Sequence, residues 1–299
     1  MTSTAFVLIL LSVVLHTLWN YASKRTESSV ALFTWVNVFG ALFLVPAALL
    51  LSDQVSALPG TVAPLLVLTG FFQALYSAGL AIGYRSGDLS FVYPLVRALP
   101  VLIVTLLTWV LRTQAPLTAR AWLGAGLVFL GCLLLPLPRF RDFRLAPYAR
   151  APAAFAALAA TGVAGYSFID SEGLRILRAE LASTPSWKIS VAYLVGQSVT
   201  TAAWLLLYSV VVAPAALARS FREQRSSAAF IGAAAYLTYG LVLWAMNYAT
   251  NVSYVVAFRQ MGIVLAVAVG LLVLREPAHP PKVLGAAVVV CGLIFMALG

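Results

Sequence analysis

Two arginines stand inside apolar stretches long enough to span a membrane, and their chemistry is that of anion recognition. Arg97 lies in SFVYPLVRALPVLIVTLLTWVL (90–111), and Arg259 lies in SYVVAFRQMGIVLAVAVG (253–270). A guanidinium is always charged and presents a planar fork of donors that matches a carboxylate. Alternatively, each side chain extends to the lipid headgroups, as an arginine near a helix end can. The sequence leaves both interpretations open.

Other polar and aromatic side chains occur at helical spacing inside the apolar stretches. His16, Trp19 and Asn20 share one face of a first helix, since residues three and four apart are neighbours there. Such groups suit a cavity in which rings stack on a flat substrate and a few polar atoms fix its orientation. They also suit packing between helices, where amides and hydroxyls bond across the interface. The substrate-binding candidates are Trp19, Asn20, Gln73, Tyr76, Tyr93, Arg97, Tyr166, Tyr236, Tyr239, Asn247, Arg259 and Gln260.

Titratable groups are scarce within the apolar stretches. No Asp or Glu falls in the middle of a stretch, and we expect Asp170 near the outer end of the sixth one. His16 is therefore the one deep candidate for proton coupling, with a hydrogen-bonded packing role as its alternative. Because no acid is expected at depth, we predict that a substrate moves down its own gradient, with weak coupling at most.

The composition identifies lipid as the solvent for most of the chain. Of the 299 residues, 62% are hydrophobic and 9% are charged, whereas soluble domains carry about 25% charged residues. The net charge of +10 comes mostly from basic residues in short loops and does not indicate nucleic acid. Two histidines, two cysteines in apolar runs and scattered acids offer no catalytic constellation. We therefore expect neither an enzyme nor a cofactor nor a metal site.

Apolar runs of about 20 residues, each able to cross the hydrocarbon as a helix, predict ten transmembrane helices. Lysines and arginines number about twelve in the loops that follow odd-numbered runs and about five in those that follow even-numbered runs. Cytoplasmic loops carry such an excess, so both termini are predicted outside. The runs are 4–23, 30–51, 62–84, 89–111, 119–136, 152–171, 188–212, 228–248, 253–273 and 281–298.

The chain also contains an internal repeat. LGAGLVFLG (123–131) matches LGAAVVVCG (284–292) at five of nine positions. Just upstream, 90–116 parallels 253–279: each has Ser, an aromatic residue, an early Arg, and Leu-Arg before the next loop. An offset of about 162 residues divides ten helices into five plus five, and an odd number per half places the second half upside down.

This pattern predicts an all-α integral membrane protein with ten transmembrane helices in two inverted five-helix repeats. Alternating-access transporters use such repeats and bind the substrate near the midplane between the halves. The predicted parts are a first repeat at 1–136, a cytoplasmic linker at 137–151 and a second repeat at 152–299.

The repeated blocks resemble the drug/metabolite transporter superfamily, in its EamA-type ten-helix branch. They are AIGYRSGDLSFVYPLVRALPVLIVTLLTWVLRTQAPLTARAWLGAGLVFLGCLLL (81–135) and NYATNVSYVVAFRQMGIVLAVAVGLLVLREPAHPPKVLGAAVVVCGLIFM (247–296). The glutamate of the family's turn is Glu276 in the second block, whereas Gln114 takes its place in the first. By resemblance, the fifth and tenth helices are peripheral and brace the two halves.

Within that superfamily, the Trp19–Asn20 pair and GYSFIDSEGLR (165–175) look most like bacterial exporters of aromatic amino acids. The resemblance implies a multi-pass inner-membrane exporter of amino acids and related metabolites, functional as a monomer in the lipid bilayer. One alternative is a broad exporter of drugs and other hydrophobic compounds. Another is an exchanger of sugar phosphates or nucleotide sugars.

Overall fold

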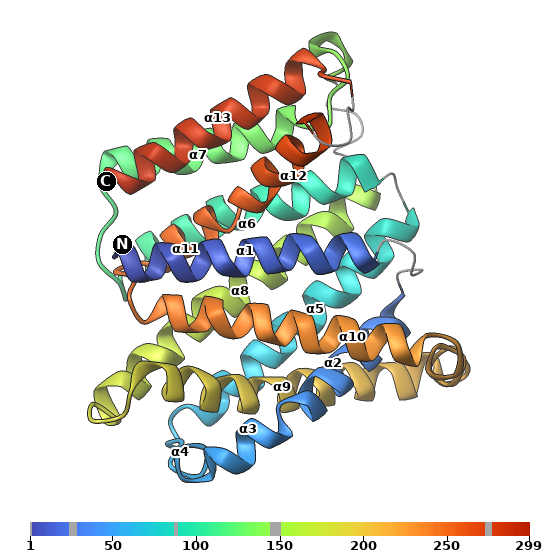
Figure 1. The fold of residues 1–299 in the computed structure, drawn as a ribbon, viewed down its shortest axis with the longest axis vertical. Helices are drawn as coiled ribbons and strands as arrows, with labels where there is room; N and C mark the ends of the chain where they lie inside the picture. The colour runs from blue at the N-terminus through green and yellow to red at the C-terminus, as the bar shows by residue number, and fades with distance from the viewer. Residues whose placement is uncertain (1, 24–28, 87–88, 144–150, 273–276) are drawn as a thin grey trace.

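All regular structure in the described part of the chain is helical. The structure is a computed structural model, and it describes residues 2–23, 29–86, 89–143, 151–272 and 277–299. The helices pack side by side in one bundle, and the two termini lie at the same end of it (Figure 1). The elements are α1 (Ser3–Ser23), α2 (Val30–Phe43), α3 (Val45–Leu50), α4 (Ser52–Ser56), α5 (Ala63–Ser86), α6 (Leu89–Leu111), α7 (Ala119–Leu134), the 3-10 turn η1 (Phe140–Asp142), α8 (Ala151–Glu180), α9 (Ser186–Val212), α10 (Pro214–Met246), α11 (Val252–Phe258), α12 (Met261–Leu272) and α13 (Pro280–Ala297).

Seven segments of the described chain are long and apolar enough to cross a membrane, which indicates a membrane-embedded protein. The apolar parts of α1, α6 and α7 are shorter. Large apolar side chains such as Leu50, Leu207 and Val211 are exposed on the helix surfaces, as expected where the solvent is lipid. The full count of ten spans stays a prediction. The seven segments are Val30–Leu50, Ala63–Gly83, Ala151–Glu180, Ser186–Val212, Pro214–Met246, Val252–Val269 and Pro280–Ala297.

Two helices are longer than the runs that predicted them. α8 continues well past the predicted 152–171, and α10 begins at Pro214 rather than near the start of 228–248. In α8 the added turns hold charged side chains with partners on the same helix: Arg175 Nε lies 2.9 Å from the carboxylate of Glu172. A prediction from hydropathy ends each helix where the apolar run ends, so it does not include these charged turns.

The predicted ninth run, 253–273, is two helices rather than one. Arg259 and Gln260 lie between the end of α11 and the start of α12. The amide of Ile263 donates to the carbonyl of Gln260 at 2.9 Å, a bond over three residues that is typical of a tight 3-10 turn. Arg259 therefore lies at a helix break inside an apolar segment.

Glycines let α7 and α13 pack backbone against backbone. A Cβ added to Gly124 would lie 2.6 Å from the carbonyl oxygen of Gly292, and one added to Gly131 would lie 2.7 Å from that of Gly285. The contacts are reciprocal, because Gly285 and Gly292 face the carbonyls of Gly131 and Gly124 in return. Small residues at a helix interface allow this close approach of two backbones.

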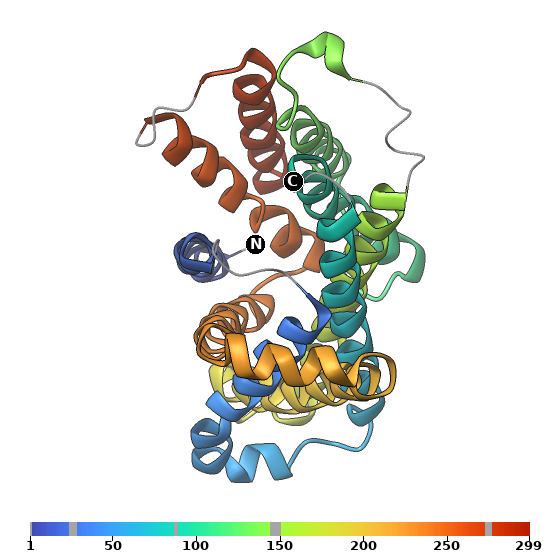
Figure 2. The same cartoon turned by 90° about the vertical axis from the view of Figure 1, so that its right-hand side faces the viewer.

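Helices from the two predicted repeats alternate around the interior of the bundle. α5 packs against α8 and α9, and α2 packs against α9 and α10. α1 lies between α10 and α12 (Figure 2). The predicted linker, 137–151, contains η1, while 144–150 lies outside the described residues. These contacts join helices of the first predicted repeat to helices of the second.

Candidate functional site

Asp170 is a carboxylate with no exposed surface, and it lies inside α8. Its Oδ1 accepts hydrogen bonds from Thr69 Oγ1 at 2.6 Å and from the Tyr193 hydroxyl at 3.0 Å. Its Oδ2 accepts from Gln197 Nε2 at 2.7 Å and from the Tyr239 hydroxyl at 2.5 Å. Four donors from α5, α9 and α10 therefore converge on one carboxylate. We call these five residues the Asp170 centre.

The position of Asp170 corrects the expectation of an acid near a helix end. α8 continues to Glu180, about 15 Å farther along the axis at 1.5 Å per residue. A buried carboxylate loses its hydration and is tolerated only when hydrogen bonds replace the lost water. All four donors in the centre are neutral, and no basic side chain of the described chain forms an ion pair with Asp170.

Three tyrosines form a row that leads to the Asp170 centre. The rings of Tyr76 on α5 and Tyr166 on α8 meet edge to face at 6.1 Å, and those of Tyr166 and Tyr239 do so at 5.6 Å. Gly162 makes the first contact possible, because a Cβ there would lie 2.6 Å from the backbone nitrogen of Tyr76. This tyrosine row offers ring faces and edges on which an aromatic substrate can stack.

Arg259 completes the row from the helix break between α11 and α12. Its guanidinium carbon lies 5.7 Å from the centroid of the Tyr239 ring, a cation–π distance. The side chain is half-buried, and no hydrogen-bond acceptor or carboxylate of the described chain bonds its guanidinium. The guanidinium therefore keeps its donors for an anion beside the aromatic row.

Arg97 on α6 and His16 on α1 form a hydrogen-bonded pair of basic side chains. A terminal nitrogen of Arg97 lies 2.9 Å from His16 Nε2. A guanidinium only donates, so Nε2 accepts, and the imidazole is neutral with its proton on Nδ1. Arg259 lies between α11 and α12, and both of these helices pack against α1, the helix that carries His16. A protonated His16 would have to give up its bond to Arg97, which makes it a poor proton carrier in this geometry.

The other candidates with described side chains form no hydrogen bond with the Asp170 centre. Tyr236 donates to Asn37 Oδ1 at 2.9 Å between α10 and α2. Asn247 donates to Ser190 Oγ at 2.7 Å at the end of α10. Gln260 is buried at the helix break and donates to the carbonyl of Val256 on α11, while Gln73 is half-buried on α5.

Three predicted site residues cannot be placed by their side chains. Trp19 and Asn20 belong to α1, and Tyr93 belongs to α6. Their side chains lie outside the described part of the structure. Their contribution to a binding site stays a prediction.

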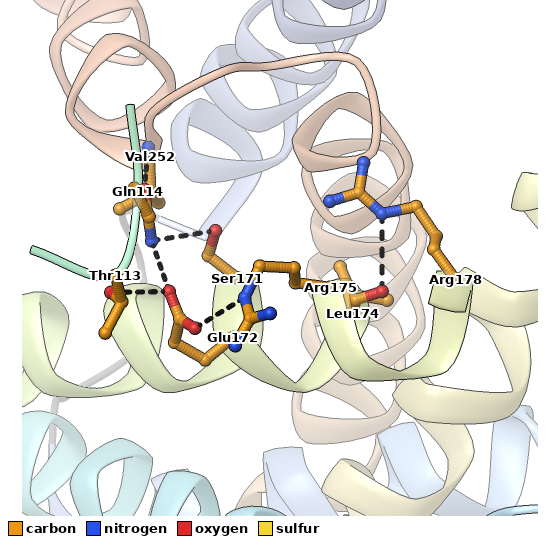
Figure 3. Close-up of polar contacts among 8 residues, drawn as sticks. All are labelled: Thr113, Gln114, Ser171, Glu172, Leu174, Arg175, Arg178 and Val252. Carbon is orange, nitrogen blue, oxygen red and sulfur yellow. Dashed lines mark hydrogen bonds and ion pairs between the residues drawn. The ribbon is translucent and has the colours of Figure 1, made fainter. Parts of the chain in front are cut away.

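A separate polar cluster ties three segments together (Figure 3), at the end of the bundle where the termini lie (Figure 1). Gln114 donates to Glu172 Oε1 at 2.9 Å and accepts from the backbone amide of Val252 at 2.8 Å. Thr113 also donates to Glu172 Oε1 at 2.9 Å, and Arg175 bonds the other carboxylate oxygen. This Gln114 tie holds the α6–α7 connection against α8 and the start of α11.

One groove in the described structure is apolar, unlike the Asp170 centre and the tyrosine row. It measures about 410 Å³ and lies between α5 and α9. Its walls include Phe71, Leu75, Trp204 and Leu207, and almost all of its surface is apolar. Exposed apolar walls on a membrane-embedded bundle face lipid tails, so this groove is not the candidate site.

Comparison with known proteins supports the fold alone. No family model matches the chain, and no curated protein matches it. Among solved structures 28 chains match. One of them, described only as "Crystal structure of protein", has a TM-score of 0.69 and 17% identity, with 100% of this chain and 98% of that chain covered. At this identity the likeness shows a shared fold and says nothing about activity.

Sequence reasoning left four members of the Asp170 centre off the list of candidates. They are Asp170, Thr69, Tyr193 and Gln197. One signal was available: Tyr166 and Asp170 lie four residues apart, as do Tyr193 and Gln197, and each pair shares a helix face. An acid on such a face within an otherwise apolar segment is a default functional candidate.

Proposed function

We propose that the protein is an inner-membrane exporter of small molecules that carry a carboxylate and an aromatic ring, with aromatic amino acids favoured. The observation that carries the proposal is the guanidinium of Arg259 beside the tyrosine row, at a helix break. The carboxylate binds Arg259 by charge-assisted hydrogen bonds. The ring stacks against Tyr166 and Tyr239.

Transport occurs by alternating access between two inverted repeats of five transmembrane helices each. Support comes from the reciprocal packing of α7 and α13, since Gly124 meets Gly292 and Gly131 meets Gly285. Residues at equivalent places in two repeats meet crosswise when a two-fold axis relates them. Broken helices are typical binding elements of such transporters, and α11 and α12 form one.

The Gln114 tie closes one end of the pathway in this conformation. It joins segments of both repeats, so the tie must open before substrate passes that end. The charge distribution predicts that this end faces outside, together with both termini. We infer from the resemblance of its two repeated blocks that the chain is an EamA-type drug/metabolite transporter of a bacterial inner membrane.

A broad exporter of hydrophobic cations is the second candidate. A cation exporter needs a carboxylate in its binding site, and Asp170 is a buried carboxylate of the kind that was not expected from the sequence. The Asp170 carboxylate already accepts four hydrogen bonds, whereas the guanidinium of Arg259 has no hydrogen-bond or ion-pair partner among the described residues. The available donor group therefore favours an anionic or zwitterionic substrate over a simple cation.

Counterflow in proteoliposomes tests this function. Vesicles preloaded with phenylalanine should accumulate labelled phenylalanine and tryptophan, while protein-free vesicles should not. Phenethylamine lacks the carboxylate and should compete at least about tenfold more weakly, because one charge-assisted bond is lost. Threonine and a sugar phosphate should also compete weakly. Preferential competition by phenethylamine would favour the cation exporter, and preferential competition by the sugar phosphate would favour the exchanger.

A further inference from the structure

The Asp170 centre contains a carboxylate whose charge is balanced by no cation in the described structure. Glu172, two residues along α8, is different because Arg175 pairs with it. Burying an ionised carboxylate is costly even when its oxygens are hydrogen-bonded, since neutral donors do not cancel the charge. Asp170 is therefore a carboxylate poised to accept a positive charge.

The groups around Asp170 come from every helix that packs there. Tyr193 on α9 and Tyr239 on α10 bond it directly. On α8 itself, Tyr166 contacts the Tyr239 ring, while Glu172 turns away to the Gln114 tie. Among the remaining titratable and charged groups of the packed helices, Tyr76 on α5 contacts Tyr166, Arg97 on α6 bonds His16, and Arg259 follows α11 at the far side of Tyr239.

Tyr239 is the link between Asp170 and Arg259. Its hydroxyl donates to Asp170 Oδ2 while its ring lies against the guanidinium of Arg259. A zwitterionic amino acid whose carboxylate binds Arg259 carries its ammonium on the adjacent carbon. If the Tyr239 side chain moves aside, that ammonium takes the place of the hydroxyl on Oδ2.

We propose that Asp170 is an exchange site that binds either a proton or the ammonium group of the substrate, but not both. This inference rests on the proposed function. The step is an acid–base exchange: the protonated acid loses its proton to water as the ammonium binds, and the carboxylate then pairs with the ammonium. No bond in the substrate forms or breaks, and no further reactant is needed.

Protonation also changes the hydrogen bonds within the centre. The ionised carboxylate accepts from all four donors, whereas a protonated oxygen must donate to one of them. Gln197 Nε2 cannot accept, so either a hydroxyl of Thr69, Tyr193 or Tyr239 turns, or the Gln197 amide rotates to present Oε1, which has no hydrogen-bond partner in the described structure. Proton binding therefore weakens the links between α5, α8, α9 and α10, because hydrogen bonds to a charged acceptor are the stronger ones.

The consequence for transport is exchange of one proton for one amino acid. A proton and an ammonium that compete for one carboxylate cross the membrane in opposite directions when the site alternates between its two sides. The sequence favoured facilitated diffusion because it placed no acid at depth. Asp170 supplies the missing group.

Proton release on ligand binding tests the proposal without any transport. The purified protein in weakly buffered detergent solution is mixed with phenylalanine, and a pH-sensitive dye reports the protons released across a series of pH values. We expect release with phenylalanine over part of that series and none with 3-phenylpropionate, which has the carboxylate and ring but no ammonium. Binding of phenylalanine without release at any pH would overturn the exchange site and leave the proposed function standing. Absence of any phenylalanine binding would overturn both.

Asp170→Asn provides the matched variant, because an amide has one acceptor and one donor group, as the protonated acid does. It should bind phenylalanine at least about tenfold more weakly, while 3-phenylpropionate binding is unchanged and proton release disappears. Unchanged 3-phenylpropionate binding also shows that the variant is folded. Proton release that persists in Asp170→Asn would contradict the assignment, and the wild-type comparison of the two ligands decides the matter if the variant does not fold.

Discussion

Arg259→Gln should lower phenylalanine counterflow by about 100-fold, because loss of a desolvated charged partner costs about 2–5 kcal/mol. The guanidinium of Arg259 lies 5.7 Å from the Tyr239 ring and has no hydrogen-bond acceptor in the described structure. Its removal therefore takes away the group that we assign to the substrate carboxylate. The glutamine keeps much of the side-chain volume at the helix break and removes the charge. Counterflow at saturating and limiting phenylalanine is the measurement.

Two controls separate a lost binding group from a damaged protein. Arg120→Gln removes a charge from an exposed position at the start of α7 and should transport as the wild type does. Phenethylamine has no carboxylate, so any residual transport of it should be the same in Arg259→Gln and in the wild type. An equal loss of transport for phenylalanine and phenethylamine would show that Arg259 does not bind the substrate carboxylate.

Gly124→Leu should destabilise the protein by about 3 kcal/mol or more and lower its melting temperature by roughly 10 °C in detergent. A Cβ at this position would meet the carbonyl oxygen of Gly292 at 2.6 Å and the backbone nitrogen of Met296 at 2.8 Å. Both are backbone atoms, so α7 and α13 must separate to admit the side chain. Thermal unfolding followed by size-exclusion chromatography measures the change.

Gly126→Leu is the matched control on the same helix. A Cβ there meets nothing within 4 Å. Leucine is also a better helix former than glycine, so stability should be unchanged or slightly higher. Equal melting temperatures for the Gly124 and Gly126 variants would contradict the close packing of α7 on α13.

The helices themselves follow from hydropathy, but their ends do not. The apolar runs predict where the long helices lie, because each run is long enough to need a lipid environment. Charged turns such as Glu172 to Arg175 continue α8 through local pairing that a hydropathy window scores as loop. The same window joins α11 and α12, since the break at Arg259 and Gln260 interrupts the backbone without interrupting the apolar sequence.

The candidate site was predictable one residue at a time but not as an arrangement. Tyr76, Tyr166 and Tyr239 were recognisable as aromatic residues within apolar helices, and the structure brings them into one row. Tyr236 looks equivalent in sequence to Tyr239, yet α2 covers Tyr236 whereas Tyr239 reaches Asp170 on α8. Periodicity gives the face of a helix and not the neighbour that covers it.

The hydrogen-bond donors of the Asp170 centre were even less predictable from sequence, because they come from distant parts of the chain. Thr69 lies 101 residues from Asp170 in sequence, and Gln197 lies 27 residues from it. A threonine or glutamine in a membrane helix most often bonds to a neighbouring helix, so neither residue type marks a site by itself. Only the packing of α5 and α9 against α8 makes them partners of a carboxylate.

The most direct test of the central claim is a structure of the protein with 4-bromophenylalanine bound. Anomalous scattering locates the bromine, and the density gives the orientation of the amino acid. We predict the bromine beside the tyrosine row of Tyr76, Tyr166 and Tyr239, with the carboxylate within hydrogen-bond distance of the guanidinium of Arg259. A bromine found only in the apolar groove between α5 and α9, or a carboxylate directed away from Arg259, would contradict the proposed site.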